Sequence, residues 1–151
     1  ALMVACQNGH GPCVRALLEA GVDCDHQNLE DWTALMYACQ NGHDRVGRDL
    51  IEAGANINYV TSDGYTALMI AAQHGLNACT HALIEAGANI DQQSMPHRST
   101  ALNVACEFGH EECALLLLRA GSHAADVADH DGDTARAFAR NKGLHRALVL
   151  M

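Results

Sequence analysis

The chain has 151 residues, of which 49% are hydrophobic and 18% charged, so it holds enough apolar material for one folded domain. Nine basic residues stand against 18 acidic ones, and the net charge of −9 argues against DNA or RNA as the main partner. No apolar run approaches the roughly 18 residues of a membrane span, and aromatic residues make up only 4%, which predicts a core of small side chains.

An Ala-Leu pair recurs along the chain at a nearly constant spacing. The pair begins at Ala1, Ala34, Ala67 and Ala101, Ala135 continues the series, and the steps are 33, 33, 34 and 34 residues. A glycine lies eight residues after each of these alanines, and an Ala-Gly pair recurs in the same register. Several markers in one phase predict a repeat protein with a period of about 33 residues.

One unit can be followed from Thr33, which is a good N-cap for a short helix. Gly42 ends this helix, because glycine readily adopts a positive φ, and a second helix with an apolar face follows. Helices of two or three turns are unstable alone, so adjacent units must bury their apolar faces. The pattern predicts an all-α solenoid with helix pairs at 2–8 and 12–19, 34–41 and 44–52, 67–74 and 77–85, 101–108 and 111–119, and 135–142 and 145–151.

The units resemble the ankyrin-repeat family, in which a hairpin turn precedes two antiparallel helices. The third unit carries the resemblance in Asp63-Gly64-Tyr65-Thr66-Ala67-Leu68, Ala71-Ala72-Gln73-His74-Gly75 and Gly87-Ala88-Asn89-Ile90-Asp91. The resemblance implies one domain, residues 1–151, built as a solenoid of about five repeats with hairpin-loop fingers. The expected repeats are 1–25, 26–58, 59–91, 92–126 and a cap-like 127–151, of which the first and last are partial.

The chain departs from the family pattern at several positions. The histidine that usually contacts the capping threonine is replaced in every repeat, so this tether is expected to be missing throughout. Asp31 stands in place of the turn glycine. The hairpin before Thr100 has one extra residue, and Ala124-Ala125 forms another insertion, which predicts local loop distortions.

The sequence predicts different surroundings for the first and the last repeat. Ala1 begins where a capping threonine would precede it, and a first repeat without a polar cap exposes an apolar face, so further chain is expected upstream. The last unit is predicted to close the stack, and its basic residues to form a solvated helix face. These residues are Arg136, Arg140, Lys142 and Arg146.

Most of the seven cysteines recur in shared repeat slots where other repeats have small apolar residues. We therefore expect packed, reduced thiols and an intracellular, cytoplasmic protein. His10 and His110 each precede a cysteine by three residues, which suggests zinc, but structural zinc needs four converging ligands. The acidic series at 129–133 lacks the later glutamate of a calcium loop.

No motif for nucleotide binding, serine hydrolysis or metalloprotease chemistry is present, so we expect a non-enzyme without cofactor or metal. The resemblance implies a module or scaffold that binds a partner protein or peptide. Nucleic acid, membrane insertion and a small-molecule ligand are not expected. The alternative is the recognition segment of a larger enzyme or channel whose catalytic part lies outside this sequence.

In the family, partners bind along the hairpin tips and the ends of the first helices. Trp32 and Tyr65 share one slot beside amide side chains, a composition typical of interface hot spots. The alternative is that each ring packs on its own hairpin. Asn58 is similar in position to residues that a 2-oxoglutarate-dependent asparaginyl hydroxylase modifies in ankyrin repeats. The expected partner-binding residues are Leu29, Trp32, Gln40, Asn41, Tyr65, Gln73, His74, Glu107 and Phe108.

Overall fold

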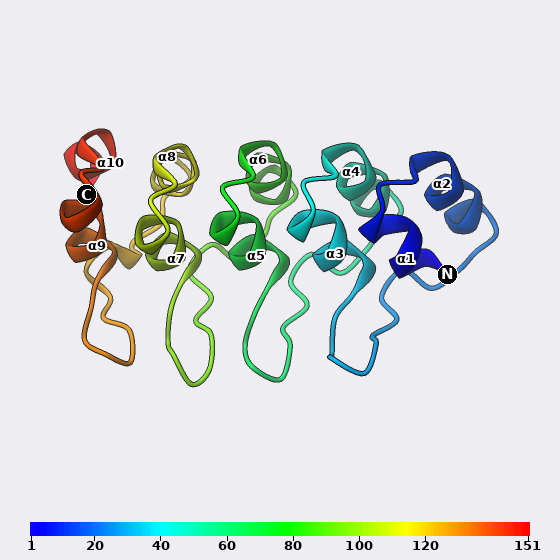
Figure 1. Cartoon of the computed structure of the whole chain (residues 1–151), viewed down its shortest axis with the longest axis horizontal. Coiled ribbons are helices and arrows are strands. Elements are labelled where there is room, and N and C mark those ends of the chain that lie inside the picture. Colours follow the sequence, from blue (N-terminus) through cyan, green and yellow to red (C-terminus); the bar gives the residue numbers. More distant parts are fainter.

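The computed structural model describes residues 1–151, and its helices form two parallel rows of one solenoid (Figure 1). This confirms the predicted all-α architecture. The inner row, beside the hairpins, holds α1 (Leu2–Gln7), α3 (Ala34–Gln40), α5 (Ala67–Gln73), α7 (Ala101–Glu107) and α9 (Ala135–Lys142). The outer row holds α2 (Gly11–Glu19), α4 (Asp44–Glu52), α6 (Asn77–Glu85), α8 (Glu111–Arg119) and α10 (His145–Leu150).

The inner helices begin where the sequence predicts and most end one residue earlier than expected. A threonine caps four of them, and its hydroxyl accepts a hydrogen bond from the third residue of the helix, as Thr66 does from the backbone N–H of Met69 at 3.3 Å. The predicted last residues of the first four inner helices are in fact C-caps, since the glycine that follows turns the chain at positive φ. These C-caps are Asn8, Asn41, His74 and Phe108.

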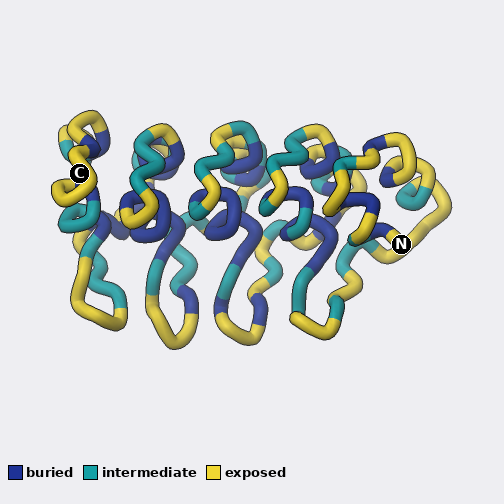
Figure 2. The backbone as a smooth tube through the Cα atoms, in the orientation of Figure 1, coloured by how far each residue is buried: buried dark blue, intermediate teal, exposed yellow.

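The core lies between the two rows and continues from repeat to repeat as one cluster of 33 buried residues. Figure 2 shows the inner helices largely buried and the hairpin tips exposed. Each inner helix packs on the next inner helix, and each outer helix on the next outer helix. Alanine is frequent in this core, as the low aromatic content predicts, and the larger side chains are aliphatic. The largest fully buried ones include Leu35, Met36, Leu68, Met69, Ile70 and Leu102.

Each hairpin is closed by a backbone hydrogen bond across its tip. In the third repeat the N–H of Thr61 donates to the carbonyl of Tyr65 at 3.0 Å, whereas in the fourth repeat Ser94 pairs with Ser99 at 2.9 Å. The hairpin of the fourth repeat therefore encloses one residue more than that of the third, as its sequence predicts. The second insertion is accommodated by a short 3-10 helix, η1 (Ala124–Asp126), before the last hairpin.

The tips of the four hairpins, which belong to the second to fifth repeats, are joined to one another by hydrogen bonds, which we call the hairpin ladder. Gly64 makes one of these close approaches possible, because it has a φ of 78° and a Cβ there would lie 2.4 Å from the backbone nitrogen of Met95. The ladder fixes the tips relative to each other without secondary structure. Its links run from Ser62 N to the Asp31 carboxylate (2.6 Å), from Met95 N to Asp63 O (2.9 Å) and from His130 N to His97 O (2.8 Å).

Asp31 shows how a non-glycine residue is tolerated at the turn position. Its φ is 64°, in the left-handed region, and aspartate adopts this conformation more easily than most residues. The carboxylate accepts hydrogen bonds from the Tyr59 hydroxyl and the Ser62 N–H, and these bonds lower the pKa of Asp31. The side chain therefore supplies a link that glycine could not.

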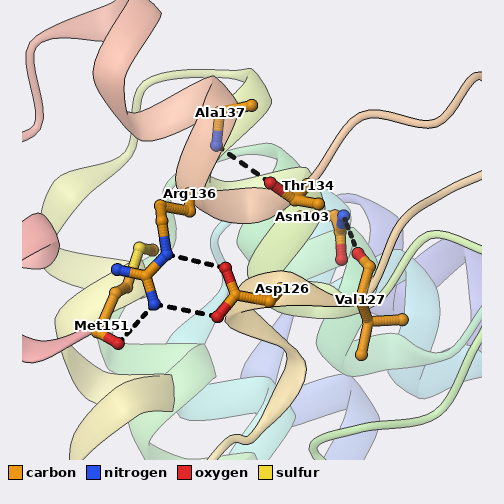
Figure 3. A network of polar contacts seen from close by, with 7 residues as sticks. All are labelled: Asn103, Asp126, Val127, Thr134, Arg136, Ala137 and Met151. Carbon is orange, nitrogen blue, oxygen red and sulfur yellow. Dashed lines mark hydrogen bonds and ion pairs between the residues drawn. The ribbon is translucent and has the colours of Figure 1, made fainter.

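In the fourth repeat Asn103 stands where the family pattern has the histidine, and it gives the capping threonine a different partner. In the fourth repeat the Thr100 hydroxyl donates to the Asn103 side-chain oxygen at 2.6 Å, and the Asn103 N–H donates back to that hydroxyl at 3.3 Å. The amide nitrogen of Asn103 also donates to the carbonyl of Val127 at 3.3 Å (Figure 3). Asn103 is fully buried and so connects its own helix to the last hairpin.

The basic residues of the last repeat do not all form a solvated face. Arg136 is only partly exposed, and its guanidinium donates to both carboxylate oxygens of Asp126, at 2.7 and 3.0 Å, and to the carbonyl of Met151 (Figure 3). This pairing lowers the pKa of Asp126. Arg146 pairs with Glu112 of the preceding repeat, while Arg140 and Lys142 are exposed. The prediction therefore fails for Arg136.

Two histidines connect neighbouring repeats. The Nε2 atom of His43 lies 3.0 Å from the carbonyl of Gln7, and that of His110 lies 3.0 Å from the carbonyl of Gln73. Each ring lies directly beneath the glycine that ends the preceding inner helix, where a Cβ would come within 2.6 Å or less of the imidazole. These two histidines therefore have a structural role, whereas in the third repeat Leu76 contacts the corresponding glycine, Gly42.

This contact predicts a difference between two equivalent histidines. His43→Ala is expected to lower the free energy of unfolding by about 1 kcal/mol, because a carbonyl between repeats loses its hydrogen bond. His10 occupies the same slot but is exposed and has no such partner, so His10→Ala is expected to stay within about 0.5 kcal/mol of wild type. Urea unfolding followed by circular dichroism measures both. Equal losses in the two variants would contradict the role given to His43.

Candidate partner-binding site

A groove of about 320 Å³ lies on the face between the hairpins and the inner helices of the last three repeats. The hairpins form one side of this groove, and α7 and α9 supply its floor. Because it crosses three repeats, its shape depends on the stacking and on the hairpin ladder. The lining residues are Tyr65, Gln73, His97, Ser99, Val104, Glu107, Phe108, Asp129, Asp131, Asp133 and Phe138.

The lining follows the register of the repeats. Tyr65, Ser99 and Asp133 each immediately precede the capping threonine and so lie on the hairpin side. Val104 and Phe138 each lie four residues after that threonine and line the groove from the inner helices, Val104 buried and Phe138 half-buried. The ends of α5 and α7 contribute the remaining helical residues, so equivalent slots of successive repeats line the groove. Those residues are Gln73, Glu107 and Phe108.

The side chain at the slot before the threonine decides whether the space above the helix stays open. In the second repeat Trp32 occupies that slot and packs on Tyr37, with ring centroids 5.3 Å apart and planes tilted by 49°. The fourth and fifth repeats have the much smaller Ser99 and Asp133 there. Above α7 and α9, Val104 and Phe138 therefore line the groove, whereas the corresponding space above α3 is filled by the Trp32 and Tyr37 rings.

Acidic side chains dominate the polar part of the groove. Its lining includes Glu107, Asp129, Asp131 and Asp133 but neither lysine nor arginine, and none of the four carboxylates forms an ion pair. Asp129 shapes the tip of the last hairpin, because its Oδ1 accepts the N–H groups of Asp131 and Asp133 at 3.0 and 2.9 Å. The carboxylates of Glu107, Asp131 and Asp133 are exposed and have no hydrogen-bond partner within the chain.

Four of the nine expected partner-binding residues lie together in this groove: Tyr65, Gln73, Glu107 and Phe108. The other five lie outside it. Leu29 is fully exposed on the second hairpin, Trp32 packs on Tyr37, and the side-chain nitrogen of Asn41 donates to the carbonyl of Tyr37 at 2.9 Å. Gln40 and His74 lie at the ends of α3 and α5. Trp32 and Tyr65 both pack partly against the core, so this slot has a packing role in both repeats.

Sequence reasoning missed the floor and the last hairpin of the groove. Val104 and Phe138 share a slot with Tyr37 and Ile70, so a bulky residue recurs there in four successive repeats. That recurrence is a signal that could have indicated the floor. The acidic series at 129–133 resembles a calcium loop only in part, but it also continues the hairpin-tip register of the earlier repeats.

Asn58 lies on the arm that leads to the third hairpin and takes part in contacts between repeats. Its side-chain oxygen accepts the N–H of Asn89 at 2.7 Å, and its amide nitrogen lies 3.5 Å from the carbonyl of Gly87. Asp25 and Asp91 accept hydrogen bonds from the next repeat in the same way. Hydroxylation of Asn58 stays a prediction, and a hydroxylase would need to open these contacts to turn the side chain into its active site.

The seven cysteines are all free, as predicted, and five of them are buried. Burial raises the pKa of both Cys6 and Cys106 to about 12, so neither is an activated nucleophile. Cys79 and Cys113 donate to Asp44 and Asn77 of the preceding repeats, each at 3.1 Å. Cys13 is an exception to the expected packing, because no earlier repeat within residues 1–151 covers its slot.

Nowhere in the chain do three or more histidine, cysteine or acidic side chains converge as metal ligands. The pairing of His10 with Cys13 and of His110 with Cys113 therefore does not extend to a larger cluster. No helix is both long and apolar enough to pass through a bilayer.

The comparisons with known proteins agree with this architecture. The family model described as ankyrin repeats (3 copies) matches residues 2–94 and, in a second overlapping match, residues 48–131. The chain belongs to the ankyrin-repeat family. A search of curated proteins finds no match. Ankyrin repeats are generally protein–protein interaction modules and are typically non-catalytic.

The Trp32–Tyr37 contact predicts a measurable coupling. Trp32→Ala and Tyr37→Ala are each expected to destabilise this ankyrin domain. The free energy of unfolding of the double variant should fall by about 0.5–1.5 kcal/mol less than the sum of the two single losses, because each single variant already removes the contact between the rings. Pairing Trp32→Ala with Phe108→Ala provides the control, since these rings form no pair and their effects should add. Additive losses for Trp32 and Tyr37 would show that the ring contact contributes nothing.

The thiols predict selective chemical reactivity. At pH 8 a thiol with a pKa of about 12 is roughly one part in 10,000 thiolate, so Cys6 and Cys106 should resist alkylation in the folded protein. Exposed Cys13 should react first with iodoacetamide. Peptide mass spectrometry over time measures the order, and denatured protein serves as the control, in which all seven cysteines should react. Early labelling of Cys6 or Cys106 would be inconsistent with their burial.

Proposed function

We propose that this ankyrin domain binds an extended segment of a partner protein in the groove of its last three repeats. The observation that supports this most directly is the accessible apolar surface of the groove. Phe108 is 49% exposed at the end of α7, and Val104, Phe138 and Tyr65 lie in the same lining. An apolar surface rimmed by polar side chains is typical of a site that binds protein.

The form of the groove favours a peptide segment over a compact ligand. It runs across three repeats that present equivalent slots in succession, so an extended chain can place successive side chains over α7 and α9. The hairpin ladder holds the tips in place before binding. Because little loop ordering is then required, less of the interaction energy is lost on association.

The polar side chains of the groove favour recognition over catalysis. Ser99 and His97 both line it, but no hydrogen bond joins their side chains, so the hydroxyl has no base positioned to activate it. No cysteine lies in the lining. These groups are therefore assigned to orienting the partner.

A displayed library of random nonapeptides, selected on the wild-type domain, tests the proposal. Peptides that bind the groove are expected to lose about ten- to thirtyfold in affinity with Phe108→Ala, because an exposed aromatic ring of the lining is removed. Leu150→Ala is the matched control, since Leu150 is also 49% exposed but lies on α10, away from the groove. Fluorescence anisotropy of the selected peptides measures both affinities.

Two outcomes would contradict the proposal. One is that selection yields no peptide whose binding depends on Phe108. The other is that Leu150→Ala weakens binding as much as Phe108→Ala. Circular dichroism melting curves of both variants show whether either change alters the fold, and Tyr65→Ala provides a second groove variant on a different repeat.

A further inference from the structure

We infer that the partner segment bound by this groove is basic and carries arginine. This inference rests on the proposed function and names the chemistry of the partner. It comes from the combination of free carboxylates and aromatic rings in one lining, which neither the fold nor the family determines.

The carboxylates of the groove form no ion pair within the chain. Four acidic side chains from two repeats line it, none forms an ion pair, and the lining contains one imidazole, that of His97, but no lysine or arginine. Elsewhere several acids are neutralised within the chain, as Asp126 is by Arg136 and Glu112 is by Arg146. The groove therefore keeps its negative charge available for a cation from outside.

The last hairpin presents this charge in a defined geometry. The Asp129 carboxylate fixes the turn through two backbone N–H groups, and the N–H of His130 is held by the carbonyl of His97 in the neighbouring hairpin. Asp131 and Asp133 are thus carried on a backbone that is already ordered, and their carboxylates have no bond to break before they accept a partner. A preorganised acidic edge favours both fast association and low reorganisation cost.

The apolar lining decides which cation fits best. The rings of Phe108, Phe138 and Tyr65 line the same groove as the carboxylates. A guanidinium group can lie flat on an aromatic ring and donate two parallel hydrogen bonds to one carboxylate, whereas an ammonium group is more strongly hydrated and forms no bidentate pair. An arginine side chain therefore uses both components of the lining at once.

The same charges exclude other classes of partner. Phosphate groups of nucleic acids or of phosphorylated peptides would meet four carboxylates without a compensating lysine or arginine in the lining. An acidic segment would be repelled in the same way. The observations thus favour a basic polypeptide over each of these.

The test uses the nonapeptides selected on the wild-type domain. The Phe108-dependent peptides are expected to be enriched in arginine, and replacing their arginines with glutamine is expected to lower affinity at least tenfold. In the protein, the triple variant Glu107→Gln/Asp131→Asn/Asp133→Asn should also lose roughly tenfold or more.

A matched variant separates a local site from the overall negative charge. Glu19, Glu52 and Glu85 are exposed and each ends an outer helix, away from the groove, so Glu19→Gln/Glu52→Gln/Glu85→Gln changes the net charge by the same amount. This variant is expected to change affinity less than twofold. Melting curves of both triple variants report on folding, and the single variant Asp131→Asn provides a milder change on the exposed tip.

The possible results separate the two proposals. Phe108-dependent peptides that are neutral or acidic would overturn the basic partner while leaving the groove as the binding site. Equal weakening by the two triple variants would also overturn it, because the overall charge and not the groove would then attract the peptides. If no peptide depends on Phe108, the proposed function itself fails, and the basic partner fails with it.

Discussion

Every repeat of this protein depends on a surface that only its neighbour can supply. A helix of seven residues, such as α3 or α5, cannot remain folded in water by its own hydrogen bonds, so its apolar face must be covered by the next helix of the row. Polar side chains add a second dependence. Asp25, Asn58 and Asp91 share one slot and accept hydrogen bonds from the following repeat, so the backbone of each arm is satisfied by the repeat before it.

The architecture could be predicted from the sequence because its determinants are local and repeated. Threonine caps, helix-ending glycines and paired apolar residues recur in one phase, and each has the same physical meaning wherever it occurs. The one-residue errors at the helix ends arise because a C-cap residue differs from a helical residue only in its hydrogen bonding. The contacts of Asn103 were not predictable in this way, since its amide replaces a side chain of different shape and reaches a hairpin distant in sequence.

The groove was only partly predictable, because a binding surface depends on differences between repeats. Trp32 and Tyr65 occupy the same slot and both pack partly on the core, yet only Trp32 has an aromatic neighbour on the helix beside it, and only Tyr65 lines the groove. The acidity of the groove has a similar origin. It comes from three aspartates of one hairpin together with Glu107 of another repeat, which are brought to one lining by stacking and not by proximity in sequence.

The hairpin ladder has a mechanical consequence. A solenoid bends by small rotations between successive repeats, and such bending changes the spacing of the hairpin tips more than that of the tightly packed helices. Hydrogen bonds between the tips, such as those from Met95 to Asp63 and from His130 to His97, oppose this change and stiffen the edge of the stack. Bending of the last three repeats therefore changes the width of the groove. A segment bound along the tips would fix both the curvature and the width.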